Sequence, residues 1–185
     1  MKNYQSIVVT LCLFGIQTGA HAQTCNLDGN KETSPASEFT VNGDGTVTHH
    51  ETRLMWMQCS LGQTWDIGSN ACSGTASTYN WKEALAEAEN FTFANYDDWR
   101  LPNIKELNSI VERNCFNPTI NLNIFPITKL SVFPNDAMVM MWSSSPRTHT
   151  TDNSRAWALR FYDGSFYAYP KDGIAFVYVR LVRGQ

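Results

Sequence analysis

The sequence predicts an α+β fold in which two helices pack on a small antiparallel sheet. Two segments with apolar residues at helical spacing begin at Asn80 and Asn103, and each asparagine is followed three residues later by glutamate, which is a capping box. Four segments rich in β-branched and aromatic residues follow both helices, and an Asp163-Gly164 turn separates the middle pair. Helices followed by successive antiparallel strands are typical of the α+β class.

The early strands follow from local sequence patterns. Strands are expected at 39–41 and 46–48, because the Asn-Gly-Asp-Gly sequence between them favours the positive φ angles of a hairpin turn. An apolar strand is expected at 54–57. Another is expected at 98–101, where Pro102 ends it.

Apolar spacing and the capping boxes define the two helices. The first helix is expected from Asn80 to near Phe91, and the second from Asn103 to about Glu112. The remaining expected elements are a long loop at 114–134, with Ile120, Ile124 and Phe125 in the core, and strands at 140–142, 156–161, 165–169 and 176–182.

The first 22 residues have the pattern of a signal peptide. Lys2 precedes an apolar run at 7–16, and an Ala-His-Ala sequence at 20–22 matches a cleavage site. The apolar run is shorter than the roughly 20 residues that span a bilayer, so no stable membrane insertion is expected. We therefore predict an exported protein, periplasmic or extracellular, with a polar segment at 23–38 and one domain at 39–185.

Four cysteines remain after the signal peptide, and an oxidising compartment favours two disulfides. Three connectivities are possible. The loop between Cys59 and Cys72 is rich in Gly, Ser and Thr, which favours that pair, together with Cys25–Cys115. Zinc binding by these cysteines is disfavoured, because the sequence has no Cys-x-x-Cys and its histidines show no ligand spacing with the cysteines.

The charge distribution argues against nucleic-acid binding and is uneven along the chain. Residues 23–185 contain 13 basic and 17 acidic residues, a net charge of −4, which is unlike a general nucleic-acid binder. From Arg147 onward, six basic residues stand against three acidic ones. This basic third would present a cationic patch, unless its arginines pair with acids of the first half such as Asp97 and Asp98.

Seven short motifs occur in an order that resembles the C-terminal domain family of Legionella collagen-like protein, from about Phe39 to Arg183. The motifs are Asn-Gly-Asp-Gly-Thr-Val at 42–47, Leu-Met-Trp at 54–56, Trp-Arg-Leu-Pro at 99–102, Lys-Glu-Leu at 105–107, Trp-Ser-Ser-Ser at 142–145, Ala-Trp at 156–157 and Val-Arg-Leu-Val-Arg at 179–183. The resemblance implies a C-type-lectin-like fold with two helices, a small twisted sheet closed by the terminal strands, and long loops. It also implies surface attachment through sulfated glycans, although this chain has no Gly-x-y repeat for a collagen-like stalk.

A calcium site is one candidate, with Asn42, Asp44 and Glu51 as ligands. Their spacing matches an EF-hand loop except at its first position, where Thr40 replaces Asp. The flanking residues are typical of strands, however, so a hairpin turn is the favoured interpretation. The calcium motifs of the lectin fold are also absent. We therefore expect no cofactor, with calcium as the weaker alternative.

A catalytic site is a second candidate, because Ser143, Ser144, Ser145 and His149 lie close in sequence. No Gly-x-Ser-x-Gly elbow is present, and serines after an aromatic strand commonly bond backbone groups. The formylglycine-generating enzymes share the wider fold that the resemblance implies, and they use reactive cysteines, whereas the even number here leaves none free. The sequence therefore favours a protein that is not an enzyme.

The third candidate is a basic and aromatic hairpin that would contact sulfate or carboxylate groups. Its residues are Arg155, Arg160, Tyr162, Tyr167, Tyr169 and Lys171. Arginine offers a planar donor fork and tyrosine a stacking surface, although half-exposed sheets also have such residues without any ligand. The sequence favours a secreted, non-catalytic ligand-binding or adhesion module for an anionic glycan or a cell-surface protein. The alternatives are an envelope enzyme related to formylglycine-generating enzymes, or an accessory subunit of a surface assembly; the oligomeric state is not indicated.

Overall fold

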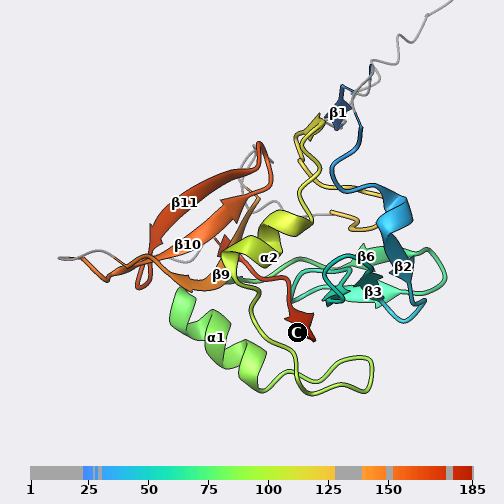
Figure 1. Ribbon diagram of the computed structural model, residues 1–185. Helices are drawn as coiled ribbons and strands as arrows, with labels where there is room; N and C mark the ends of the chain where they lie inside the picture. Colours follow the sequence, from blue (N-terminus) through green and yellow to red (C-terminus); the bar gives the residue numbers. More distant parts are fainter. Residues whose placement is uncertain are drawn as a thin grey trace, which may run out of the picture.

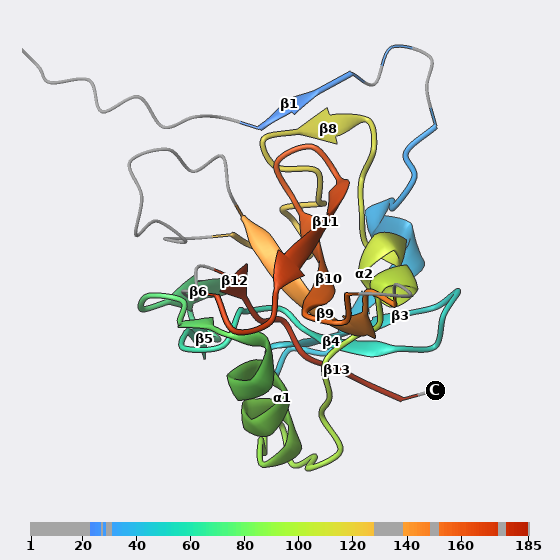
Figure 2. The ribbon, with the colours of Figure 1, turned by 90° about the vertical axis from the view of Figure 1, so that its left-hand side faces the viewer.

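Two β-sheets and two helices form most of the described protein, which is α+β as predicted (Figures 1 and 2). The computed structural model describes residues 23–26, 28, 31–127, 139–148, 152–173 and 177–184. The expected signal peptide at 1–22 therefore lies outside the described residues. None of the helices in these ranges is long and apolar enough to cross a bilayer.

The larger sheet has five strands in the order β11–β10–β9–β12–β7. These strands are β7 (Thr78–Tyr79), β9 (Met140–Pro146), β10 (Arg155–Arg160), β11 (Ser165–Pro170) and β12 (Val177–Tyr178). The expected meander is present, because β9, β10 and β11 pair antiparallel in sequence order. The prediction of a wholly antiparallel sheet is wrong, because β12 pairs parallel with β9.

The smaller main sheet has four strands in the order β13–β4–β3–β2, all antiparallel. They are β2 (Phe39–Val41), β3 (Thr46–His49), β4 (Met55–Met57) and β13 (Val182–Arg183). The turn between β2 and β3 contains Gly43 and Gly45 at φ +84° and +87°, which confirms the expected hairpin. A short 3-10 helix, η1 (Ala36–Glu38), precedes β2.

The end of the chain connects the two sheets. We expected one strand at 176–182, but Val177–Tyr178 belong to the larger sheet and Val182–Arg183 to the smaller one, while residue 176 lies outside the described ranges. The chain leaves the first sheet after Tyr178 because its backbone then bonds β4 and its flanking loop. Leu61 donates to the carbonyl of Val179, and Met57 to that of Leu181, at 2.9 and 3.1 Å.

The helices cover opposite faces of the larger sheet. Ala84 and Ala88 of α1 (Trp81–Glu89) pack with Trp142 and Ala158. On the other face, α2 (Ile104–Ser109) buries Leu107 in the cluster that contains Met141 and Leu159. Both capping boxes are confirmed: each asparagine accepts from the backbone of the glutamate three residues on, whose carboxylate bonds back.

Several short elements differ from the expectation. Helix α2 ends at Ser109, because the following residues turn toward the N-terminal segment, where the carboxylate of Glu112 accepts from the amides of Thr33 and Ser34. These bonds attach the polar segment 23–38 to the body of the domain.

No strand forms at 98–101, where a single bridge joins Arg100 to Val182. Two small pairs were not expected: β1 (Thr24–Cys25) with β8 (Cys115–Phe116), and β5 (Thr64–Asp66) with β6 (Ala71–Ser73).

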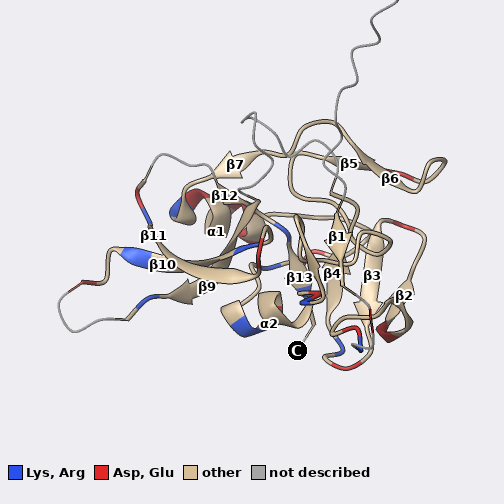
Figure 3. Ribbon diagram, turned by 90° about the horizontal axis from the view of Figure 1, so that it is seen from above, with Lys and Arg blue, Asp and Glu red and all other residues tan. Residues whose placement is uncertain are grey.

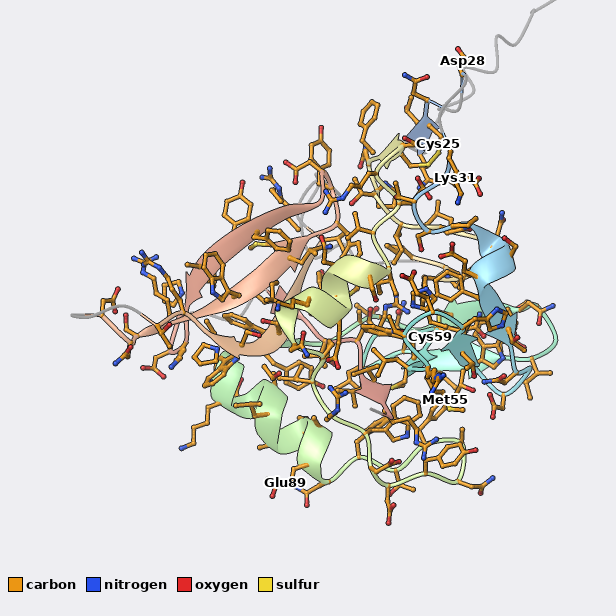
Figure 4. All side chains as sticks on the ribbon, in the orientation of Figure 1. Cys25, Asp28, Lys31, Met55, Cys59 and Glu89 are labelled. Atoms are coloured by element: carbon orange, nitrogen blue, oxygen red, sulfur yellow. A yellow bond between two sulfur atoms is a disulfide. The ribbon has the colours of Figure 1, made fainter. Side chains whose placement is uncertain are left out.

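The structure contains two disulfides, Cys25–Cys115 and Cys59–Cys72, the pairs that the sequence favoured. Cys25 lies at the periphery, where β1 meets β8, whereas Cys59 lies within the body of the molecule (Figure 4). The first bond joins the N-terminal strand to the segment after α2. The second joins the end of β4 to the β5–β6 pair.

We predict that Gly62→Ala destabilises the protein more than Gly43→Ala. Both glycines have positive φ, which costs other residues about 1–2 kcal/mol. A Cβ at Gly62 would also lie 2.6 Å from the backbone nitrogen of Ser77, whereas one at Gly43 would meet nothing within 4 Å. Overpacking adds a further ~1–3 kcal/mol at Gly62 only. Urea unfolding of both variants measures the difference, and equal losses would contradict the observed packing.

Candidate binding site

A shallow hollow opens between α2 and the β10–β11 hairpin. Its volume is about 280 Å³, and its lining is mainly apolar. The lining residues are Ile104, Lys105, Asn108, Trp157 and Phe166. Phe166 is 46% exposed, while Trp157 is half-buried. Exposed aromatic surface of this kind commonly marks a ligand-binding or interaction site.

Strand register brings the two aromatic rings to the same side of the sheet. Trp157 pairs with Ala168, and Leu159 pairs with Phe166, so all four side chains point toward α2. Trp157 and Ile104 are both partly exposed, because α2 is short and covers only part of this face. The sequence did contain a signal for this arrangement. Antiparallel pairing of the two strands that flank the Asp163-Gly164 turn places Phe166 beside Trp157 on the same face.

Hydrogen bonds at its first turn hold α2 beside the hollow. The amide of Ile104 donates to Ser145 Oγ of β9 at 3.0 Å, which fixes the helix against the larger sheet. Glu106 accepts two bonds of 2.8 Å from the Arg100 guanidinium. Lys105, by contrast, lines the hollow and makes no ion pair with any residue in the described ranges.

Three basic side chains lie around the hollow, and Figure 3 shows basic segments on both α2 and β10. Lys105 is part of the lining, and Arg113 donates to Asn108 Oδ1 at 2.5 Å. Arg155 lies two residues before Trp157 on β10 and thus on the same face, where Asp152 pairs with it at 3.6 Å. Within the described ranges, Lys105 and Arg113 make no ion pair, so these two side chains leave positive charge beside the hollow, whereas Asp152 balances Arg155.

The six ligand-binding residues predicted from the sequence do not converge. Three of them lie together at the turn of the hairpin. There the Arg160 guanidinium pairs with Asp163, with Nε 3.0 Å from Oδ1, and its Cζ lies 4.8 and 5.8 Å from the rings of Tyr167 and Tyr162. The charge of Arg160 is thus already balanced within the protein.

The others lie toward the opposite end of the hairpin. Tyr169 packs edge-on against Trp142 with ring centroids 5.9 Å apart, and Lys171 Nζ lies 4.6 Å above the ring of Trp81 at the start of α1. Arg155 alone shares the face of the hollow. Arg183 pairs with an acid of the first half, as the alternative expected, because its Nε lies 2.6 Å from Asp98 Oδ1. Arg155 and Arg160 pair instead with Asp152 and Asp163, which belong to the basic third itself.

The serines considered for catalysis have structural hydrogen bonds. Ser143 Oγ donates to the carbonyl of Trp157 at 2.6 Å, and Ser145 Oγ accepts from the amide of Ile104. His149 lies outside the described residues. In the part of the chain that is described, these serines thus join β9 to its neighbours.

The calcium candidates lie in a strand–turn–strand segment rather than between two helices. Asn42 Nδ2 donates to Thr46 Oγ1 at 2.8 Å, and Asp44 Oδ1 accepts from the Thr46 amide at 3.0 Å. These bonds close the β2–β3 turn. Glu51 gathers with Glu38 and His49 instead of with Asp44.

Comparison with protein families identifies the domain. The family model described as Lcl C-terminal domain matches residues 45–183, from the β2–β3 turn to β13. The chain belongs to the Lcl C-terminal domain family. This Lcl C-terminal domain includes both helices, the whole larger sheet and every residue of the hollow. No curated protein and no solved structure matches the chain.

We predict that acid weakens the protein partly through Asp163. The Arg160 guanidinium holds the pKa of Asp163 well below its ordinary value. Because the folded pKa is the lower one, the stabilisation is complete above the unfolded pKa of about 4 and disappears as the pH falls through the folded pKa. Both groups are partly exposed, so the contribution is at most about 1 kcal/mol. Urea midpoints from pH 5 to pH 2 should fall less steeply for Asp163→Asn, and parallel profiles would contradict this.

Proposed function

We propose that this Lcl C-terminal domain is an exported, non-catalytic module that binds an anionic glycan in the hollow between α2 and the β10–β11 hairpin. One observation supports this above the others. Phe166 is open to solvent and Trp157 is partly so, both beside Lys105, whose ammonium has no acidic partner among the described residues. A site of this kind combines an apolar surface with a free positive charge.

The chemistry of the lining suits a charged sugar. Aromatic rings pack against the C–H faces of sugar rings, and Phe166 is sufficiently exposed to do so. The side-chain amide of Asn108 offers polar contacts to hydroxyl groups. Lys105, with Arg113 nearby, would attract a sulfate or carboxylate group. The cationic surroundings favour an anionic occupant over a neutral one.

The cysteines and serines support a binding role over an enzymatic one. All four cysteines of the described chain form disulfides, so no thiol among them is free to act as a nucleophile. Ser143 and Ser145 bond backbone groups rather than a catalytic base. The relation to formylglycine-generating enzymes would rest on fold alone, which is a weak basis for activity.

Export and a C-type-lectin-like arrangement belong to the same proposal. Two disulfides fit an oxidising compartment outside the cytoplasm. Two helices on opposite faces of a sheet closed by the chain's end fit the lectin-like arrangement that the family resemblance implies. Adhesion to a cell surface would follow if several copies acted together, because a single shallow site binds weakly.

Heparin, a sulfated polysaccharide, is a suitable probe for the proposed site. The protein should be retained on immobilised heparin at about 50 mM salt, where screening is weak, and should elute as the salt rises. The double variant Lys105→Ala with Phe166→Ala should bind at least roughly tenfold more weakly, because it removes both the charge and the open ring. Both side chains lie at the surface, so folding should be preserved, which circular dichroism would check.

A second double variant distinguishes the two faces of the hairpin. Arg160→Ala with Lys171→Ala removes two positive charges where the first double variant removes one, but on the Trp81 and Tyr167 side of the sheet. Its retention should remain within about twofold of the original protein. If this variant loses binding and the first does not, the ligand contacts the opposite face. Flow-through of the unmodified protein at low salt would contradict glycan binding altogether.

A further inference from the structure

A cluster of side chains that could bind a metal ion lies toward the edge of the smaller sheet opposite β13, near β2 and β3. Glu38 ends η1, His49 ends β3, and Glu51 lies in the turn that follows. One ligand atom from each of these three residues lies within 4.8 Å of the other two. The backbone holds the cluster together, because the His50 amide donates to the Glu38 carbonyl at 2.8 Å.

His49 is the fixed member of this cluster. Its side chain is only 1% exposed, and its ring stacks on Phe39 with centroids 4.5 Å apart. Nδ1 lies 2.9 Å from Thr52 Oγ1. Nε2 is buried, has no hydrogen-bond partner, and faces Glu38 Oε2 at 3.7 Å, which is too long for a hydrogen bond. A buried nitrogen left without a partner is costly and requires an explanation.

An ordinary ion pair does not provide that explanation. In a close ion pair the ring nitrogen would donate a hydrogen bond to the carboxylate, whereas Nε2 and Glu38 Oε2 lie 3.7 Å apart and Nε2 makes no hydrogen bond. In the tautomer whose Nδ1 proton is donated to Thr52 Oγ1, the lone pair of Nε2 points toward the Glu38 carboxylate. A hydrogen bond from Nδ1 of this kind commonly orients metal-bound histidines.

We propose that Glu38, His49 and Glu51 bind one divalent transition-metal ion, with Zn²⁺ as the best fit. Zinc accepts imidazole nitrogen and carboxylate oxygen at about 2.0–2.2 Å, and three protein ligands with water complete a tetrahedron. The nitrogen ligand distinguishes this site from a calcium site, which takes oxygen ligands. Glu38 is 34% exposed at its side chain and Glu51 is exposed, so both carboxylates are free to close the remaining distance around an ion.

The proposed ion would join the N-terminal segment to the domain. Glu38 precedes residue 45, where the match to the family begins, whereas His49 and Glu51 lie within it. Bound zinc would therefore link η1 to the β3–β4 turn. Because the three ligands come from η1, the end of β3 and the turn after it, and line no part of the hollow, the site is independent of the glycan hollow.

Titration of the metal-free protein tests the proposal. After treatment with a chelator, Zn²⁺ should bind at one equivalent in competition with a chromophoric chelator, and it should raise the melting temperature. Glu51→Gln should weaken binding by at least roughly tenfold, since one charged ligand is lost. Glu89→Gln is the matched control, because Glu89 is exposed at the far end of α1, away from η1 (Figure 4); its affinity should equal that of the original protein.

A spectroscopic measurement separates this site from loose surface binding. Co²⁺ bound in place of Zn²⁺ should show the strong visible absorption that is typical of tetrahedral coordination by one histidine nitrogen and oxygen ligands. The double variant Glu38→Gln with Glu51→Gln retains the buried His49 and should fold, but it should show neither this absorption nor a shift in melting temperature. Zinc affinity unchanged in this double variant, or no binding by the original protein, would overturn the proposal.

Discussion

The burial of Arg180 at the crossing between the two sheets is the constraint on which the rest of the structure depends. Its Nη1 donates to the carbonyls of Met57, at 2.8 Å, and Gln58, and its guanidinium faces the ring of Phe125 at 5.1 Å. Burial lowers the pKa of Arg180 to about 9, so the group still bears its charge at neutral pH. A charge in this position, without a carboxylate partner among the described residues, is stable only while these carbonyls and the ring surround it.

The arrangement of both sites follows from this crossing. Residues 177–182 are buried throughout, with Val177, Val179 and Leu181 in one core cluster and Tyr178 and Val182 in the other. The segment thus fixes the larger sheet relative to the smaller one. The proposed glycan hollow depends on the larger sheet and α2, and the proposed metal site on the smaller sheet and η1. The positions of both proposed sites therefore depend on how this buried segment joins the two sheets.

Sequence reasoning succeeded where neighbouring residues determine the structure. Asn80 and Asn103 form their caps with residues three positions away, and the glycines near Asp44 set a turn within a few residues. It failed where distant pairing decides. The two-residue strands β7, β12 and β13 exist only because partners far along the chain bond them. Likewise, Trp157 looks like a core residue until the length of α2 is known, and Glu38 approaches His49 only through the path of η1.

Native-state hydrogen exchange tests the central claim most directly. If the buried segment around Arg180 holds the sheets as one unit, amides of β3 and β4 should open with the same free energy as those of β9 and β10, equal to the global free energy of unfolding. Exchange of the four-stranded sheet through a separate opening of clearly lower free energy, while the five-stranded sheet stays protected, would contradict the account.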